Sequence, residues 1–239
     1  MKFKFLKIVL TTYRYAVMLS VGALSISGTA SATLIDSIAA LNDGDQYRVL
    51  FVTSTTRDAT SKDINVYNSF VYDAAQAGTV TGGLGLTWTA LASTDAVDAI
   101  ANTGMLNNTD AVTLFNTIGD IIAMSGHEIW GGSLDAPIAH DENGVANNTL
   151  VFTGTTSHGR IDIFNSLGGK YKISNIGYSP SITNDWIGWA RAYQTLTLNY
   201  YGVSDQATHV AVQVPSPSTV ILLSLGLAGL SYSRYRKQS

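Results

Sequence analysis

Gln46-Tyr-Arg-Val-Leu-Phe-Val-Thr-Ser54 is rich in β-branched and aromatic residues and contains a single charge, on Arg48. A run of this composition predicts a β-strand that is buried on one face or on both. Such a strand belongs near the centre of a sheet. We therefore expect the other elements to be arranged around residues 46–54.

A helix is predicted directly after this strand. Thr60 or Ser61 can cap its first turn, and Gly78 can end it. Small and apolar residues recur between these limits at helical spacing, namely Ile64, Tyr67, Val71, Ala74 and Ala75. One face of the helix is therefore apolar, and we expect it to cover one face of the sheet.

The rest of the body predicts further strands separated by loops. Residues 86–92 alternate like a strand, and Thr94 can then cap a short helix that runs through Ala101. The chain from Gly104 to Ala146 is rich in turn residues and is expected to be mostly loop. Two alternating runs, 193–200 and 208–214, predict an edge hairpin. The fold class is thus α+β, a single domain with a mixed or antiparallel sheet, one or two helices and long loops.

The N-terminus has the features of a secretory signal. Its basic residues Lys2, Lys4, Lys7 and Arg14 precede a small, apolar segment at 16–26, and Ala30-Ser31-Ala32 offers small residues where a signal peptidase cuts. We expect residues 1–32 to be a signal peptide. An uncleaved N-terminal anchor is the alternative.

The C-terminus, residues 214–239, has three parts. The motif Val214-Pro215-Ser216-Pro217 would stop a preceding strand, because proline withholds a backbone donor. An apolar run follows that is barely long enough to span a membrane, and the chain ends with a basic cluster at Arg234, Arg236 and Lys237. The basic end is expected on the cytoplasmic side, so the body, residues 33–213, lies outside the cytoplasm.

This tail resembles the PEP-CTERM sorting signal of Gram-negative bacteria, which the membrane protease exosortase recognises. Ser216 stands where that family usually has Glu. The resemblance implies exosortase as a partner, a short transmembrane helix before processing, and delivery to the cell envelope, outer surface or matrix. An ordinary C-terminal membrane anchor is the alternative.

The charge balance excludes some partners. The whole chain has 14 Lys/Arg against 17 Asp/Glu, but the two ends hold seven of the basic residues and none of the acidic ones, so the body has a net charge of about −10. An acidic surface repels phosphate backbones and anionic headgroups, which argues against nucleic acid and peripheral lipid. Cations and neutral glycans remain as partner classes. There is no cysteine, so no disulfide or thiolate site supports the domain.

Four blocks of the body carry a second resemblance, namely residues 47–61, 86–94, 130–138 and 151–155. They are similar to blocks of an uncharacterised group of exported bacterial proteins with the same kind of tail. Their order also resembles the C-type-lectin-like fold in its endostatin form. That resemblance implies a fold and, by itself, no activity.

Catalytic motifs are sparse. His127-Glu128 lacks the second histidine of a zinc helix, and the histidines at 127, 140, 158 and 209 are scattered. Glu128 and Glu142 are the only glutamates, so a hydrolase acting on polysaccharide would have to use them, or pair one with Asp141 or Asp185. This is the alternative to a protein without catalysis.

Aromatic and amide side chains in loops favour sugar binding, because aromatic faces stack on sugar rings and Asn and Asp bond to hydroxyls. The candidates are Trp130, Asn184, Asp185, Trp186 and Trp189. For Trp186 and Trp189 the core is the favoured alternative, because three-residue spacing across a glycine often marks packing. Trp88 is expected in the core.

The resemblance to sugar-binding lectins, whose Glu-Pro-Asn and Trp-Asn-Asp motifs hold calcium, suggests a calcium site at Glu142, Asn143, Asn184 and Asp185. Neither motif is intact here. By resemblance to other exosortase substrates, the expected setting is the exopolysaccharide matrix of a biofilm, where the chain would be a non-enzymatic glycan-binding or structural module.

Overall fold

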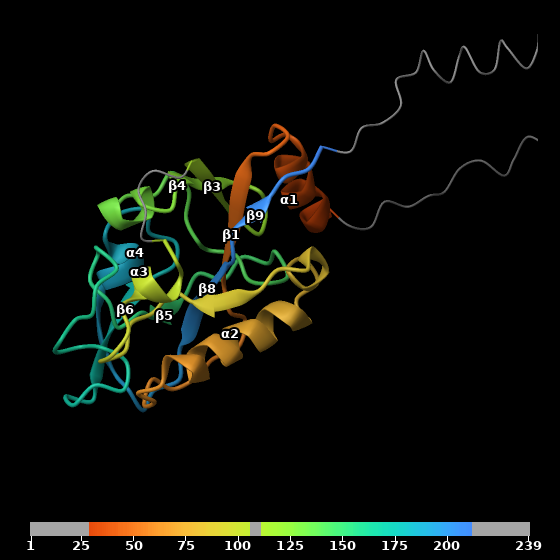
Figure 1. Ribbon diagram of the computed structural model, residues 1–239. Coiled ribbons are helices and arrows are strands. Elements are labelled where there is room, and N and C mark those ends of the chain that lie inside the picture. The colour runs from red at the N-terminus through yellow and green to blue at the C-terminus, as the bar shows by residue number, and fades with distance from the viewer. Residues whose placement is uncertain (1–28, 106–110, 212–239) are drawn as a thin grey trace, which may run out of the picture.

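The computed structural model describes residues 29–105 and 111–211, and these form an α+β domain built on one mixed sheet (Figure 1). The helices of this part are α1 (Thr29–Ala39), α2 (Ile64–Ala77), α3 (Ala99–Asn102) and α4 (Asp185–Gly188), with 3-10 turns η2 (Gly82–Leu84) and η3 (Glu128–Gly131). The strands are β1 (Gln46–Val52), β2 (Trp88–Ala90), β3 (Ala111–Asn116), β4 (Ile121–Ser125), β5 (Leu150–Phe152), β6 (Ile173–Tyr178), β7 (Ala190–Tyr193), β8 (Asn199–Ser204) and β9 (Ala207–Thr208). The predicted fold class is confirmed.

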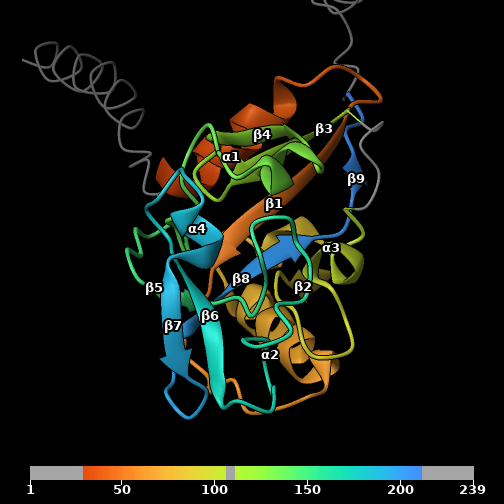
Figure 2. The same cartoon turned by 90° about the vertical axis from the view of Figure 1, so that its left-hand side faces the viewer.

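The strand predicted at residues 46–54 is β1, and it lies inside the sheet. The strand order is β4-β3-β1-β8-β5-β6-β7, with β2 paired to β8 and β9 paired to β1. β1 runs parallel to β3 and antiparallel to β8. Figure 2 shows β1 and β8 crossing the middle of the domain.

Both faces of β1 are buried. Val49 and Phe51 belong to one apolar cluster, whereas Leu50 and Val52 belong to another. Successive side chains of a strand point to opposite faces, so these two clusters lie on opposite sides of the sheet. The first cluster includes the apolar faces of α1 and α2, and the second includes residues of α3, β4, η3 and α4.

Helix α2 covers the sheet as predicted. Its buried residues are the five expected from the spacing, and Gly78 is its C-cap. The start differs, because the N-cap is Asp63, whose side chain accepts from the Asn65 amide at 3.0 Å. Gly202 of β8 lets the helix approach closely, since a Cβ there would overlap the Phe51 ring and meet Val71 at 2.7 Å.

Two expectations about the rest of the sheet were wrong. Part of the predicted loop region forms the β3–β4 pair, because the short apolar runs there bury side chains against β1. The predicted edge hairpin does not form. Its first run turns at Tyr193, whose carbonyl accepts from Leu196 at 3.1 Å, and the true strand, β8, is central with all six residues buried.

The C-terminal end of the described chain returns to the start of β1. β9 pairs with β1, and the His209 amide donates to the Asp45 carbonyl at 2.8 Å. In the ranges 29–105 and 111–211, no helix has the length and apolar character needed to cross a membrane. The predicted sorting motif and basic cluster at 214–239 lie outside these ranges, as do residues 1–28 of the signal peptide predicted at 1–32, whose last four residues are part of α1.

Candidate functional site

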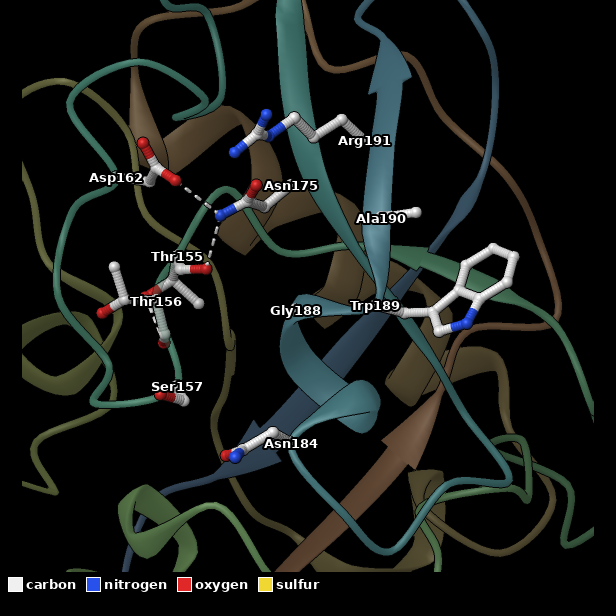
Figure 3. Close-up of a pocket in the computed structure, with 10 residues that line it drawn as sticks. All are labelled: Thr155, Thr156, Ser157, Asp162, Asn175, Asn184, Gly188, Trp189, Ala190 and Arg191. Carbon is white, nitrogen blue, oxygen red and sulfur yellow. Dashed lines mark hydrogen bonds between the residues drawn. The ribbon is translucent and has the colours of Figure 1, made fainter.

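A polar pocket of about 580 Å³ lies beside β7, the last strand of the sheet (Figure 3). We call it the polar pocket. It is lined by Thr155, Thr156, Ser157, Asp162, Asn175, Asn184, Gly188, Trp189, Ala190 and Arg191. Three segments build it: the loop after β5, strand β6, and the α4–β7 connection. Two of the predicted sugar-binding residues, Asn184 and Trp189, are among its lining.

Asn175 and Asp162 form the fixed polar centre of the pocket. The Asn175 Nδ2 donates to Asp162 Oδ2 at 2.9 Å and to the Thr155 carbonyl at 3.0 Å. The Asp162 carboxylate also accepts from the amides of Phe164 and Asn165 at 2.9 and 3.1 Å, and from Asn165 Nδ2 at 3.0 Å. Figure 3 shows Asn175 joining these two neighbours.

These contacts set the charge state of Asp162. Burial acts to raise the pKa of this carboxyl, but the hydrogen bonds from the Asn165 and Asn175 side chains and from the Phe164 and Asn165 amides outweigh burial. The net effect is a lowered pKa. The Asp162 side chain is therefore an anion near neutral pH with its oxygens already occupied by donors.

Arg191 brings an uncommitted cation to the pocket. Its register partner across β6–β7 is Asn175, and Figure 3 shows its guanidinium on the same side of β7 as Asn175 and Asp162. Arg191 is exposed, and it forms neither an ion pair nor a side-chain hydrogen bond within the described part of the chain. The other arginines of that part are engaged: Arg48 with two carbonyls, Arg57 over the Tyr67 ring and Arg160 with Asp98.

Trp189 lines both the polar pocket and a second hollow. Its side chain is 51% exposed, and Figure 3 shows the indole pointing away from Arg191. Tyr178 lies beside it, with ring centroids 6.0 Å apart. The second hollow, which we call the apolar hollow, has a volume of about 500 Å³ and is lined by Leu150, Ile173, Ile176, Trp189, Ala190, Arg191, Ala192, Tyr193 and Leu196.

Two predicted sugar-binding residues are core residues instead. Trp130 is 3% exposed and Trp186 is fully buried, so neither indole face is available to a sugar. The Trp130 Nε1 donates to the Met105 carbonyl at 3.3 Å, and Trp186 packs against Trp130 and Tyr201. Burying such large rings contributes strongly to the stability of the core, and this is the role that the structure gives them. Trp88, at 3% exposed, is in the core as expected.

The candidate calcium ligands fall into two pairs with different neighbours. Glu142 is buried and accepts from the Ser54 amide and hydroxyl, and Asn143 accepts from the Thr79 amide at 3.0 Å. Asn184 instead lines the polar pocket, and Asp185 begins α4. Within the described ranges, no three His, Asp or Glu side chains are grouped as metal ligands. The structure gives the two pairs no shared hydrogen-bond partner.

The two glutamates of the hydrolase alternative also have structural contacts. Glu128 Oε2 accepts from the Met124 amide at 2.8 Å, and this ties η3 to β4. Glu142 ties the end of β1 to the loop at 141–144. Neither residue lines the polar pocket.

Only Asn184 and Trp189 of the pocket lining were predicted, and the residues missed include the three that carry its charge and its fixed amide, Asp162, Asn175 and Arg191. Asn175 and Arg191 are 16 positions apart and meet only because β6 pairs with β7 in this register. These residues could have been found from the sequence only by predicting a strand at residues 173–178 and assigning residues 190–193 as its pairing partner.

No family model matches this chain, and no curated protein matches its sequence.

Proposed function

We propose that this chain is an exported, non-enzymatic module that binds extracellular polysaccharide at β7. The observation behind the proposal is the exposed Trp189, which lines both the polar pocket and the apolar hollow at the edge of the sheet. Exposed aromatic rings stack on the apolar faces of sugars, and amides beside them bond to hydroxyls.

The polar pocket supplies suitable partners for hydroxyl groups. Both amide protons of Asn175 are committed to Asp162 and Thr155, so its Oδ1 is left as an acceptor. Asn184 has no side-chain hydrogen bond among the described residues and offers both a donor and an acceptor. Each of the two side chains can therefore bond to a separate sugar hydroxyl.

The two hollows suit a chain of sugars better than a single sugar. They share Trp189, Ala190 and Arg191, so both border β7, and a ligand long enough to pass over this edge strand can occupy both. Units bound in sequence act as linked ligands, and affinity then rises with chain length until both hollows are filled.

Binding is favoured over hydrolysis because the polar pocket contains one carboxyl, Asp162. A glycosidase of the usual kind needs two carboxyls, one of which donates a proton. Asp162 accepts four hydrogen bonds and has a lowered pKa, which suits it to hold the pocket together rather than to donate a proton.

The setting of this function rests on the chain ends. We propose export through the signal at 1–32, sorting by exosortase at Val214-Pro215-Ser216-Pro217, and delivery to the envelope or biofilm matrix of a Gram-negative bacterium. The lectin-like, endostatin-like form of the fold is part of the proposal. The intact mass of protein released from the envelope tests the sorting step. We expect a C-terminus near residues 214–218, and recovery of Arg234 to Ser239 on the mature form would leave a simple anchor.

A glycan array probed with the purified full chain tests the binding step. We expect polysaccharide binding without release of reducing ends, and loss of binding in Trp189→Ala. Tyr72→Ala is the matched control, because Tyr72 is an exposed aromatic residue of α2 outside both hollows. The proposal fails if no glycan binds, or if Trp189→Ala binds as the unchanged chain does.

A further inference from the structure

We infer, building on the proposed function, that the polar pocket takes an acidic sugar unit whose carboxylate pairs with Arg191. The guanidinium is exposed, points to the side of β7 that holds Asp162 and Asn175, and has no partner among the described residues (Figure 3). Guanidinium is a planar fork of donors that matches a carboxylate in bidentate geometry.

The carboxylate of Asp162, which also lines the pocket, does not pair with Arg191. Asp162 forms no ion pair with Arg191, and its oxygens accept from Phe164, Asn165 and Asn175. Turning Asp162 toward Arg191 would break these bonds and free the Asn175 amide. The arrangement therefore keeps the guanidinium open to an incoming anion.

The neighbouring side chains favour a ligand in which the carboxylate belongs to a sugar. The Asn175 Oδ1 cannot bind an anion, because it is an acceptor, but it can take a hydroxyl proton. A unit with a carboxylate on Arg191 and a hydroxyl on Asn175 satisfies both groups, and Asn184 lies farther along the pocket, where it can bond to a neighbouring unit (Figure 3). A simple anion would satisfy only the first.

The overall negative charge of the body does not prevent this contact. The Debye length is about 8 Å at physiological ionic strength, so most of the distant acidic residues are screened at the pocket. Repulsion still grows with each added charge on the ligand. A short acidic oligosaccharide can therefore bind despite the negative body, whereas the sequence alone left cations and neutral glycans as partner classes.

Titration calorimetry of the full chain with three trisaccharides tests the inference. The probes are trigalacturonate, its carboxyl-reduced form galactotriose, and galactotriose sulfated at C6. We expect trigalacturonate to bind about tenfold more tightly than galactotriose, as charge-assisted bidentate bonds allow. Arg191→Gln should remove this preference while galactotriose still binds, and Arg191→Lys should keep part of it. Lys170→Gln, an exposed cation outside the pocket, should keep all of it.

Equal affinity for trigalacturonate and galactotriose would overturn the inference and leave the proposed function standing. Tighter binding of the sulfated form would overturn the carboxylate assignment. A preference that survives in Arg191→Gln would place the anion elsewhere. If no trisaccharide or array glycan binds, the proposed function fails and the inference fails with it.

Discussion

The Asn175 side chain reaches the Asp162 carboxylate at 2.9 Å, and through this bond strand β6 holds the loop that forms one wall of the polar pocket (Figure 3). The same amide group donates to the Thr155 carbonyl at 3.0 Å. One side chain thus fixes two points of the loop after β5. The pocket is shaped in advance of any ligand, which reduces the ordering cost of binding.

Asp162 should make the free energy of unfolding depend on pH in the acidic range. Its pKa is lowered from the ordinary 3.8 in the folded chain, so its contribution is present above that value and is lost as pH falls through the folded pKa. We expect Asp162→Asn to destabilise by about 1–3 kcal/mol at pH 7, because charge-assisted bonds are lost. Urea unfolding at neutral pH and near pH 2 measures the difference, which should shrink in acid. Asp185→Asn is the control, because the exposed Asp185 carboxylate accepts no hydrogen bond among the described residues, and it should cost less at pH 7.

Gly177 is where α4 rests on β6. A Cβ at this position would overlap the Trp186 carbonyl oxygen and meet the Ile187 Cα at 3.1 Å, and backbone atoms cannot move aside as a flexible side chain can. We expect Gly177→Ala to lower the free energy of unfolding by about 3 kcal/mol or more. Gly188→Ala is the control, since nothing lies within 4 Å of its added Cβ. Thermal unfolding of both variants decides this, and equal melting temperatures would contradict it.

The spacing of apolar residues in the sequence predicted the helices and strands whose buried residues recur at a regular interval. The β1 run and the five buried positions of α2 were correct because one strand or helix face decides them. The edge hairpin was wrong because residues 193–198 alternate like a strand but do not continue β7, whereas β8 is specified by pairing with β1 and β2. Strand partners depend on contacts far apart in the sequence, which periodicity does not encode.

The site was predicted only in part for the same reason. Trp189 and Asn184 could be proposed from residue type, but Trp130 and Trp186 have the same type and lie in the core. Exposure separates these tryptophans, and exposure follows from the packing of α4 against β6. In the sequence Arg191 could not be told from the other arginines, because its lack of an ion-pair partner within residues 29–105 and 111–211 is visible only in the structure.

Glu142 should be structural rather than catalytic. Its oxygens accept from the Ser54 amide and hydroxyl, so a Gln amide group would set a donor against one of these donors. We expect Glu142→Gln to destabilise by about 1–3 kcal/mol. Glu128→Gln is the matched variant, and its exposed side chain should cost less. Chemical denaturation measures both. A stable Glu142→Gln that loses a polysaccharide-cleaving activity would instead support the hydrolase alternative.

Calcium should have little effect on stability. An ion that binds only the folded chain raises its melting temperature by mass action, so a chelator would lower it. The candidate ligands Glu142 and Asn143 are already committed to Ser54 and Thr79. We therefore expect the melting curve to be unchanged by a chelator. A reproducible fall in melting temperature, reversed by added calcium, would restore the calcium hypothesis.

Trp186 and Trp189 lie three residues apart and should respond oppositely to truncation. Trp189 is half exposed at β7, so Trp189→Ala should weaken polysaccharide binding by about 1–3 kcal/mol and leave the melting temperature nearly unchanged. Trp186 is fully buried against Trp130 and Tyr201, so Trp186→Ala should destabilise by about 3–5 kcal/mol through the cavity it creates. Calorimetric titration and thermal unfolding of both variants separate the two roles. Loss of stability in Trp189→Ala, with unchanged affinity per folded molecule, would show that this indole serves packing alone.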